Sequence, residues 1–270
     1  DLAGLSNDAS AEIDPELTKQ INYKGSERFA REAKKAGVQR YIYSSSASVY
    51  GAGAKPSLSE GDPLYPQTEY AKSKVAMEKV LMELKDENFH PTMLRNATIF
   101  GLAPRMRFDL AINIMTMRAW KDRVIYIMGG GEQWRPFVHV RDVVKAFIMC
   151  LEAPLEKVDG EIFNVGSSNL NFQIKQLAQF VVDVIPHVQI HTIPDDADKR
   201  TYNLNFEKIQ RVLVFEASVQ VHDCIVEIKQ ALEKGIISPD DQTCFTLQWY
   251  KSLLTWADRV KELSYNGAIM

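Results

Sequence analysis

The pattern of apolar and polar positions predicts alternating helices and strands in the first part of the chain. Apolar and small residues recur at helical spacing after Asp14-Pro15, a capping residue and a first-turn proline, and Gly37 ends this run. In order, the predicted elements are a helix over 14–36, a strand over 38–43, a helix over 68–85 and a strand over 91–100. Helices and strands that alternate with short connections are typical of a parallel, doubly wound α/β sheet.

The alternation becomes irregular after Gly101, where the pattern predicts a smaller α+β lobe. The predicted helices cover 109–120, 141–151, 172–184 and 206–213, and the predicted strands cover 124–128, 137–140, 160–165 and 188–193. Gly129-Gly130-Gly131 lies between two of these strands and predicts a hairpin-like turn. We expect a sheet domain over 1–105 and a second lobe over 106–270, with possible return strands to the sheet. Amphipathic helices near 222–234 and 246–263 are expected to cover the fold or to form a dimer contact.

Composition and charge narrow the class of protein. The chain has 270 residues, of which 46% are hydrophobic and 25% charged, as in globular proteins with a sizeable core. Its 32 Lys+Arg and 35 Asp+Glu give a net charge of −3 without a dense basic run, which excludes nucleic acid as the main partner. Three widely spaced cysteines favour a reducing compartment, so we expect a cytoplasmic protein. No apolar run approaches the roughly 20 residues of a membrane span, so no membrane association is predicted.

The sharpest chemical signal is Tyr70, followed four positions later by Lys74. Residues at this spacing lie on one face of a helix, so the two side chains can approach a common point. A free tyrosine titrates at about pH 10, but a neighbouring ammonium and a cationic cofactor ring both favour the phenolate. The pair can therefore act as a base. Alone the spacing is a weak signal, because many helices carry an exposed tyrosine and a solvated lysine.

Three serines, Ser44 to Ser46, follow a predicted parallel strand. Ligands of open α/β sheets bind at this carboxyl edge, where a hydroxyl can hold a substrate while Tyr70 moves its proton. A helix cap or a plain turn would also explain the serines. The serine run and the Tyr70-Lys74 pair together are more specific than either is alone.

Further segments are NYKGS at 22–26, SSSASVYG at 44–51, YAKSK at 70–74, RNATIFG at 95–101, RPFVHVRD at 135–142, NVG at 164–166 and DKRTY at 198–202. Together with Leu2-Ala3-Gly4, they resemble the extended short-chain dehydrogenase/reductases. Within that family the resemblance is to the NAD-dependent nucleotide-sugar epimerases and dehydratases, of the UDP-glucose 4-epimerase type. It covers essentially the whole chain. It implies a Rossmann-like NAD-binding domain within 1–105 and a nucleotide-sugar lobe within 106–270.

The resemblance also implies roles for individual residues. The catalytic set is Ser46, Tyr70 and Lys74: Tyr70 is the general acid/base, Lys74 holds the nicotinamide ribose and lowers the tyrosine's pKa, and Ser46 orients the reacting hydroxyl. The residues implied for NAD binding are Leu2, Ala3, Gly4, Ser44 and Asn96, with Tyr70 and Lys74. Those implied for the nucleotide-diphosphate sugar are Ser46, Thr98, Asp109, Arg135 and Arg200. Arginine suits a diphosphate because its planar fork donates paired hydrogen bonds, but a salt bridge from Arg135 to Asp142 or Glu132 is the alternative.

The chain departs from the family's pattern in three places. None of its 14 glycines forms the G-x-x-G-x-x-G or G-x-G-x-x-G loop that holds a dinucleotide's phosphates. Because residues 1–5 have the pattern of a buried strand end, we expect the first βα units of the family's fold to be missing. Thr98 stands where many relatives carry an asparagine, which leaves the sugar preference open. Ala47-Ser48 follows Ser46 in place of the Asp-Glu pair of sugar 4,6-dehydratases, which favours an epimerase.

The predicted function is epimerisation of a nucleotide sugar by transient hydride removal to NAD, with NADP as the alternative cofactor. Two other functions stay open: a nucleotide-sugar dehydrogenase or 4-keto-reductase of the same family, and a non-catalytic nucleotide-sugar-binding protein. The helices over 15–36 and 68–85 correspond to those through which relatives dimerise, so a homodimer is expected. No histidine shows ligand spacing and no metal is predicted, and His139, in an apolar strand, is interpreted as structural.

Overall fold

The computed structural model describes residues 1–51, 55–194, 201–265 and 268–269. Its helices are α1 (Asp8–Ala11), α2 (Pro15–Lys19), α3 (Ser26–Lys35), α4 (Glu69–Leu84), α5 (Ala111–Asp122), α6 (Val140–Glu152), α7 (Ile174–Val184), α8 (Glu207–Leu213), α9 (Val221–Glu233) and α10 (Thr246–Glu262). Its strands are β1 (Arg40–Ser46), β2 (His90–Asn96), β3 (Thr98–Phe100), β4 (Val124–Met128), β5 (Trp134–His139), β6 (Ile162–Val165), β7 (Asn171–Gln173), β8 (Gln189–Ile193), β9 (Ser264–Tyr265) and β10 (Ala268–Ile269). A π-helical segment, Gln20–Gly25, joins α2 to α3.

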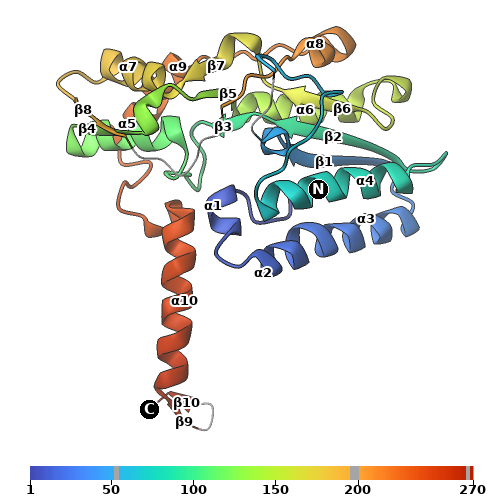
Figure 1. The fold of residues 1–270 in the computed structure, drawn as a ribbon, viewed down its shortest axis with the longest axis horizontal. Coiled ribbons are helices and arrows are strands. Elements are labelled where there is room, and N and C mark those ends of the chain that lie inside the picture. The colour runs from blue at the N-terminus through green and yellow to red at the C-terminus, as the bar shows by residue number, and fades with distance from the viewer. Residues whose placement is uncertain (52–54, 195–200, 266–267, 270) are drawn as a thin grey trace.

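The first layer of the fold is a parallel sheet in the order β1-β2-β6. Figure 1 shows α3 and α4 stacked below this sheet and α6 above it. The register pairs Ser44, Ser45 and Ser46 of β1 with Leu94, Arg95 and Asn96 of β2, so the serine run and Asn96 share one edge. Helices on both faces of a parallel sheet make a doubly wound α/β fold, which confirms the predicted fold class.

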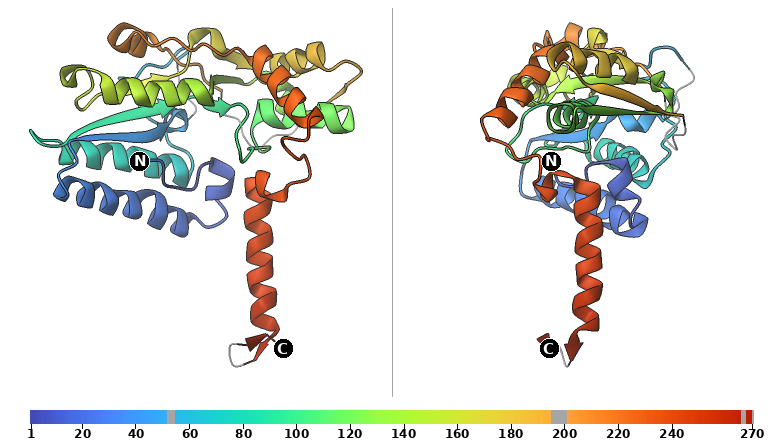
Figure 2. Two further views of the ribbon diagram at one scale, coloured as in Figure 1. Left: turned by 180° about the vertical axis from the view of Figure 1, so that it is seen from behind. Right: turned by 90° about the vertical axis from the view of Figure 1, so that its left-hand side faces the viewer.

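The second lobe has its own apolar core. Helices α5, α7 and α9 surround it beside the parallel pair β4-β8 and the mixed sheet β3-β5-β7, with Phe108, Phe137 and Ile228 fully buried. The helix α10 runs away from the rest of the molecule, as Figure 2 shows from two sides. Within the described ranges, no helix is both long and apolar enough to cross a bilayer.

Residues 1–5 do not form the buried strand end that their pattern predicts. Asp1 pairs with β1, since its N–H donates to the Ile42 carbonyl and its own carbonyl accepts the Ser44 N–H at 3.1 Å. The Asp1 carboxylate then accepts the N–H of Ala3 at 2.9 Å, a local bond that turns the chain away from the sheet. Leu2 is consequently 77% exposed.

The helix predicted over 14–36 contains a π turn in its middle. This turn faces Asn22 inward, where its amide Nδ2 donates to the Leu5 carbonyl at 2.9 Å and its Oδ1 accepts the Leu5 N–H at 2.7 Å. Asn22 is only 1% exposed. Insertions of this kind are often found at functional sites, and here the π turn anchors the chain leading to α1.

Two predictions about strand partners are wrong. The single strand predicted over 91–100 is two strands, because the chain changes sheet at Ala97: β2 pairs with β1 and β6, whereas β3 pairs with β5. The three glycines at 129–131 are not a hairpin turn, since β4 pairs with β8 and β5 with β3 and β7. Apolar periodicity indicates that a segment is a strand, but it does not select the partner.

Candidate functional site

A cavity of about 540 Å³ opens where β1 and β2 end, between the sheet and the second lobe. Most of the predicted site residues line it: Leu2, Ala3, Gly4, Ser44, Ser46, Tyr70, Lys74, Asn96, Thr98, Asp109 and Arg135. Arg200 lies outside the described residues. Segments far apart in the sequence therefore meet at the carboxyl edge of the sheet, where ligands of open α/β folds bind.

The three serines at the end of β1 all line the cavity but differ in burial. Strand side chains alternate between faces, so Ser44 and Ser46 are partly exposed while Ser45 is buried. The Ser46 hydroxyl caps the short 3-10 turn that follows, where its oxygen accepts the N–H of Ser48 at 3.2 Å and the Ser48 hydroxyl at 3.0 Å. These bonds fix the position of the Ser46 oxygen at the cavity wall.

Tyr70 reaches this oxygen from the first turn of α4. Thr68 caps the helix by accepting the Ala71 N–H at 3.2 Å. This cap fixes the first turn of α4 and with it the backbone position of Tyr70. Burial of the hydroxyl is the main cause that raises the pKa of Tyr70 to about 12. The Ser46 side chain and the Arg107 charge act on this pKa in the opposite direction, and the Asp8 carboxylate acts in the same direction as burial. Without further positive charge the phenol is protonated at neutral pH.

Lys74 lies one turn along α4, with its ammonium against the end of β1. Nζ donates to the Ser44 carbonyl at 2.7 Å and lies 5.5 Å from the centre of the Tyr70 ring and 4.7 Å from that of Tyr43. Burial lowers the pKa of Lys74 to about 8, against an opposing effect of the Glu78 charge. The lysine thus holds a positive charge beside Tyr70 up to mildly alkaline pH.

The predicted cofactor side of the cavity is built from Leu2 to Gly4 and Asn96. Gly4 has a φ of 149°, and a Cβ there would lie 2.9 Å from the Asn22 Oδ1, so a side chain is excluded where the chain passes the anchoring amide. Asn96 donates from Nδ2 to the Ser44 hydroxyl at 3.1 Å. Its Oδ1 is buried and has no hydrogen-bond partner among the described residues. A ligand that donates to this oxygen would satisfy it.

The predicted substrate residues Thr98 and Asp109 also line the cavity. Asp109 holds Arg107 in a two-pronged ion pair, with N–O distances of 2.8 and 2.7 Å, and accepts the Asn7 amide at 2.6 Å. Arg107 also donates to the Ser6 hydroxyl at 2.7 Å. The pair therefore ties the segment before α1 to the second lobe and lines the cavity at the same time.

Arg135 enters the cavity from β5. Its guanidinium lies 5.5 Å from the centre of the Tyr202 ring and donates to the Trp134 carbonyl at 2.9 Å. The two carboxylates considered as salt-bridge partners are engaged elsewhere: Asp142 accepts backbone N–H groups of Ser218 and Val219, and Glu132 pairs with Lys175. Arg135 thus lines the cavity with its guanidinium over the Tyr202 ring.

Sequence reasoning missed three groups near the cavity. Asp8 of α1 and Tyr202 both line it, and both act on the pKa of Tyr70. Glu78, buried below the serines, forms an ion pair with Arg95 at 2.7 Å. Glu78 could have been found from the sequence, because its helical spacing from Tyr70 and Lys74 puts all three residues on one face of α4.

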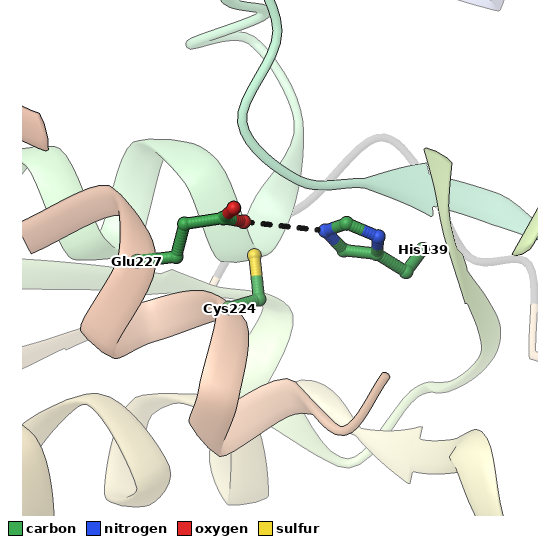
Figure 3. Close-up of side chains that lie close together, drawn as sticks. All are labelled: His139, Cys224 and Glu227. Carbon is green, nitrogen blue, oxygen red and sulfur yellow. Dashed lines mark ion pairs between the residues drawn. The ribbon is translucent and has the colours of Figure 1, made fainter. Parts of the chain in front are cut away.

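A second group of chemically active side chains lies away from this cavity. Figure 3 shows His139 pointing from the end of β5 toward Cys224 and Glu227 of α9, and their potential ligand atoms lie within 4.8 Å of one another. His139 Nδ1 accepts the Arg141 N–H at 3.2 Å and thereby caps α6. The neutral imidazole then carries its proton on Nε2, which faces Glu227 at 3.6 Å. In this tautomer Nε2 has no lone pair for a cation, and burial raises the pKa of the Cys224 thiol. The capping bond agrees with a structural role for His139.

Comparison with known proteins identifies the family. The model of the NAD-dependent epimerase/dehydratase family matches residues 1–166. The chain belongs to this family. The resemblance read from the sequence is thereby confirmed.

Relatives within the family catalyse different reactions. The chain is 30% identical over 166 residues to a dTDP-D-glucose 4,6-dehydratase of Mus musculus, a match that covers 61% of this chain and 45% of that protein. It is 31% identical over 157 residues to a UDP-glucose 4-epimerase of Mycolicibacterium smegmatis, covering 57% of this chain and 49% of that one. The chain spans about half the length of these curated relatives.

Solved structures share the fold over more of the chain. MoeE5, solved with UDP-glucuronic acid and NAD, superimposes with a TM-score of 0.78 at 22% identity, covering 87% of this chain and 78% of MoeE5. The UDP-glucose 4-epimerase of Thermotoga maritima, solved with UDP-glucose, gives a TM-score of 0.78 at 24% identity, covering 87% of this chain and 77% of the epimerase. At this identity the likeness establishes the fold.

Proposed function

We propose that the chain acts in the NAD-dependent epimerisation of a nucleotide-diphosphate sugar. The observation that carries this proposal is the convergence of Ser46, Tyr70 and Lys74 on one wall of the cavity, with Arg135 on another. A hydroxyl donor, a phenol and an ammonium that line the cavity at the same strand end form a proton-transfer group. A protein that only binds nucleotide sugars would have no use for this arrangement.

The cavity suits the nicotinamide end of NAD. The unpartnered Asn96 Oδ1, the Ser44 hydroxyl and the Lys74 ammonium supply one acceptor and two donors side by side, which fits the polar groups of a ribose and a carboxamide. When bound, NAD supplies the oxidant that takes a hydride from a sugar carbon and returns it. Leu2, Ala3 and Gly4 would lie along the same side of the cofactor.

In this proposal the protein's own residues move the proton and hold the sugar. Tyr70 accepts the proton of the reacting sugar hydroxyl, and Ser46 orients that hydroxyl. Lys74 keeps positive charge near the phenol and lowers the free energy of the phenolate. Arg135 donates to the diphosphate, and Asp109 and Thr98 contact the sugar or the nucleoside.

Two other reactions of the family are the competing candidates. A 4,6-dehydratase is favoured by the identity to the Mus musculus enzyme, but residues 47 and 48 are a buried alanine and a buried serine, where the resemblance expects the acids that eliminate water. A dehydrogenase or 4-keto-reductase would use the same proton-transfer group and would consume its cofactor.

Product analysis separates these candidates. The protein is incubated with UDP-glucose, UDP-glucuronic acid or dTDP-glucose and substoichiometric NAD, and the sugar is followed by proton NMR. We expect an epimer without accumulation of NADH. NADH formed in step with product would select the dehydrogenase, and a 4-keto-6-deoxy sugar would select the dehydratase. Bound NAD, detected by mass spectrometry of the purified protein, tests the cofactor separately.

We further propose that the protein works as a cytoplasmic homodimer. All three cysteines are free and buried, which suits a reducing compartment. Apolar side chains are exposed on the outer helical layer, with Phe29 57% exposed on α3 and Met82 44% exposed on α4. A second copy would remove them from water.

A further inference from the structure

A buried carboxylate lies directly beneath the serines of the candidate site. Glu78 of α4 is 3% exposed, and three hydrogen bonds surround it: one from the Ser45 hydroxyl at 2.6 Å and two from Arg95, at 3.0 Å from Nε and 2.7 Å from a terminal nitrogen. Ser45 and Arg95 are equally buried and face each other in the register of β1 and β2. One carboxylate thus joins a helix to two strands.

These bonds fix the parts of the site relative to one another. Ser45 lies between Ser44, whose carbonyl accepts a hydrogen bond from the Lys74 ammonium, and Ser46, which lines the cavity with Tyr70 and lowers the pKa of its phenol. Glu78 follows Lys74 by one turn on the helix that carries both Tyr70 and Lys74. A shift of β1 along α4 would therefore break the Ser45 bond to Glu78 and move Ser46 away from the phenol.

The network continues across the sheet and also includes the partly exposed Glu60, whose carbonyl accepts a hydrogen bond from Arg95 at 3.1 Å. Arg95 donates from its other terminal nitrogen to the Tyr50 hydroxyl at 3.0 Å, and Tyr50 donates to Asn164 Oδ1 at 2.7 Å. Asn164 belongs to β6, so the network spans all three strands of the sheet. A fully hydrogen-bonded buried network of this kind is rigid, because each displaced group would lose a partner.

The charge of Glu78 also acts on Lys74. The groups that face Lys74 are the phenols of Tyr43 and Tyr70, the Ser44 carbonyl, the backbone nitrogen of Asp1 and the Glu78 carboxylate. Of these, the Glu78 carboxylate carries the negative charge that favours the charged lysine, against the effect of burial.

We propose that Glu78 is a positioning residue of the candidate site, which holds the strand end with Ser46 in line with Tyr70 and Lys74 on α4. The proposal rests on the proposed function for its effect on turnover. The alignment itself can be measured without turnover.

Three variants test it. Ser45→Ala removes the hydrogen bond from the strand end to Glu78 and keeps the ion pair between Glu78 and Arg95. Glu78→Gln removes the negative charge of the carboxylate. Glu83→Gln, on the exposed side of the same helix, is the control. In protein labelled with ¹³Cζ-tyrosine and ¹³Cε-lysine, Tyr70→Phe and Lys74→Arg assign the two resonances. We expect Ser45→Ala to shift the Tyr70 resonance, Glu78→Gln to move the Lys74 titration to lower pH, and Glu83→Gln to change neither.

If the wild-type protein turns over a nucleotide sugar, kcat and KM of the variants are also measured. We expect kcat to fall by about tenfold in Ser45→Ala while KM changes little, because a misplaced proton acceptor affects the reaction step and leaves substrate contacts intact. A wild type without turnover contradicts the proposed function, and the NMR readout then tests Glu78 alone. A Tyr70 resonance in Ser45→Ala that superimposes on the wild type overturns the inference, even if Glu78→Gln fails to fold.

Discussion

The phenol of Tyr70 is a weak acid in this protein, with burial raising its pKa to about 12. The Ser46 side chain and the Arg107 charge lower the pKa, but they do not offset the loss of water around the phenol. The proposed proton transfer by Tyr70 therefore requires additional positive charge next to the phenol ring. Lys74 is already beside the ring, so a bound nicotinamide would supply this further charge.

Tyr70→Phe tests the proton-transfer role directly. The substitution removes one hydroxyl and leaves the ring, so the fold and the thermal midpoint are expected to stay close to those of the wild type. We expect kcat to fall by between about 10² and 10⁴-fold, the usual contribution of a general acid/base. Initial rates measured by product analysis check this, and an active Tyr70→Phe would contradict the assignment.

The pH dependence follows from Lys74. Burial lowers its pKa to about 8, so the ammonium is charged below that pH and loses its charge as the pH rises through it. We expect kcat/KM, which reports the free protein, to fall on the alkaline side near pH 8. In Lys74→Met the remaining activity is expected to lack this alkaline limb, whereas Lys72→Met, an exposed neighbour on α4, keeps it. An unchanged limb in Lys74→Met would assign the titration to another group.

The candidate site could be predicted where reactive side chains lie close together in the sequence, on one helix or at one strand end. Tyr70 and Lys74 are one helical turn apart, and Ser46 follows a recognisable strand, so a single helix and a strand end define the group. The Asn7-Asp109 contact could not be predicted, because it joins segments a hundred residues apart through two surface-type residues. The partner of Glu78 could not be predicted either, because Arg95 reaches it from β2, a different element.

At element scale, the π turn at Gln20–Gly25 is the feature that anchors the first residues beside the cavity. Asn22→Ala would leave the N–H and the carbonyl of Leu5 without their partners. We expect a loss of about 1–3 kcal/mol in the free energy of unfolding, measured by urea titration. The exposed Asn169→Ala is the control and should have almost no effect. A stability of Asn22→Ala equal to that of the wild type would show that this anchor is dispensable.

Helices and strands were predicted well where their apolar pattern is long and lies on one face. They were predicted less well where the strand that they pair with decides the structure. The helix α4 and the strand β1 lie close to their predicted ranges because caps and apolar positions are local properties. The break at Ala97 could not be read from 91–100, since both halves are apolar and differ only in the sheet they join. Likewise, Asp1 resembles a strand end but continues into a turn made by its own side chain.

At the scale of the whole molecule, the outer faces of α3 and α4 predict association. We expect light scattering at micromolar concentration to give the mass of a dimer, and Phe29→Lys to give the mass of a monomer, because a charged side chain would have to be buried in the interface. Leu263→Lys, on the projecting C-terminal segment, is the control for a general effect of added charge. A monomeric wild type would refute the homodimer.

We propose that one cavity brings a nucleotide sugar to the Ser46, Tyr70 and Lys74 group. A crystal structure of the protein with NAD and UDP-glucose or UDP-glucuronic acid would test this. We expect the sugar to lie against Ser46 and Tyr70, the diphosphate to contact Arg135, and the nicotinamide to lie beside Lys74 and Asn96. A nucleotide sugar bound elsewhere, with its sugar ring out of reach of the Tyr70 hydroxyl, would contradict it.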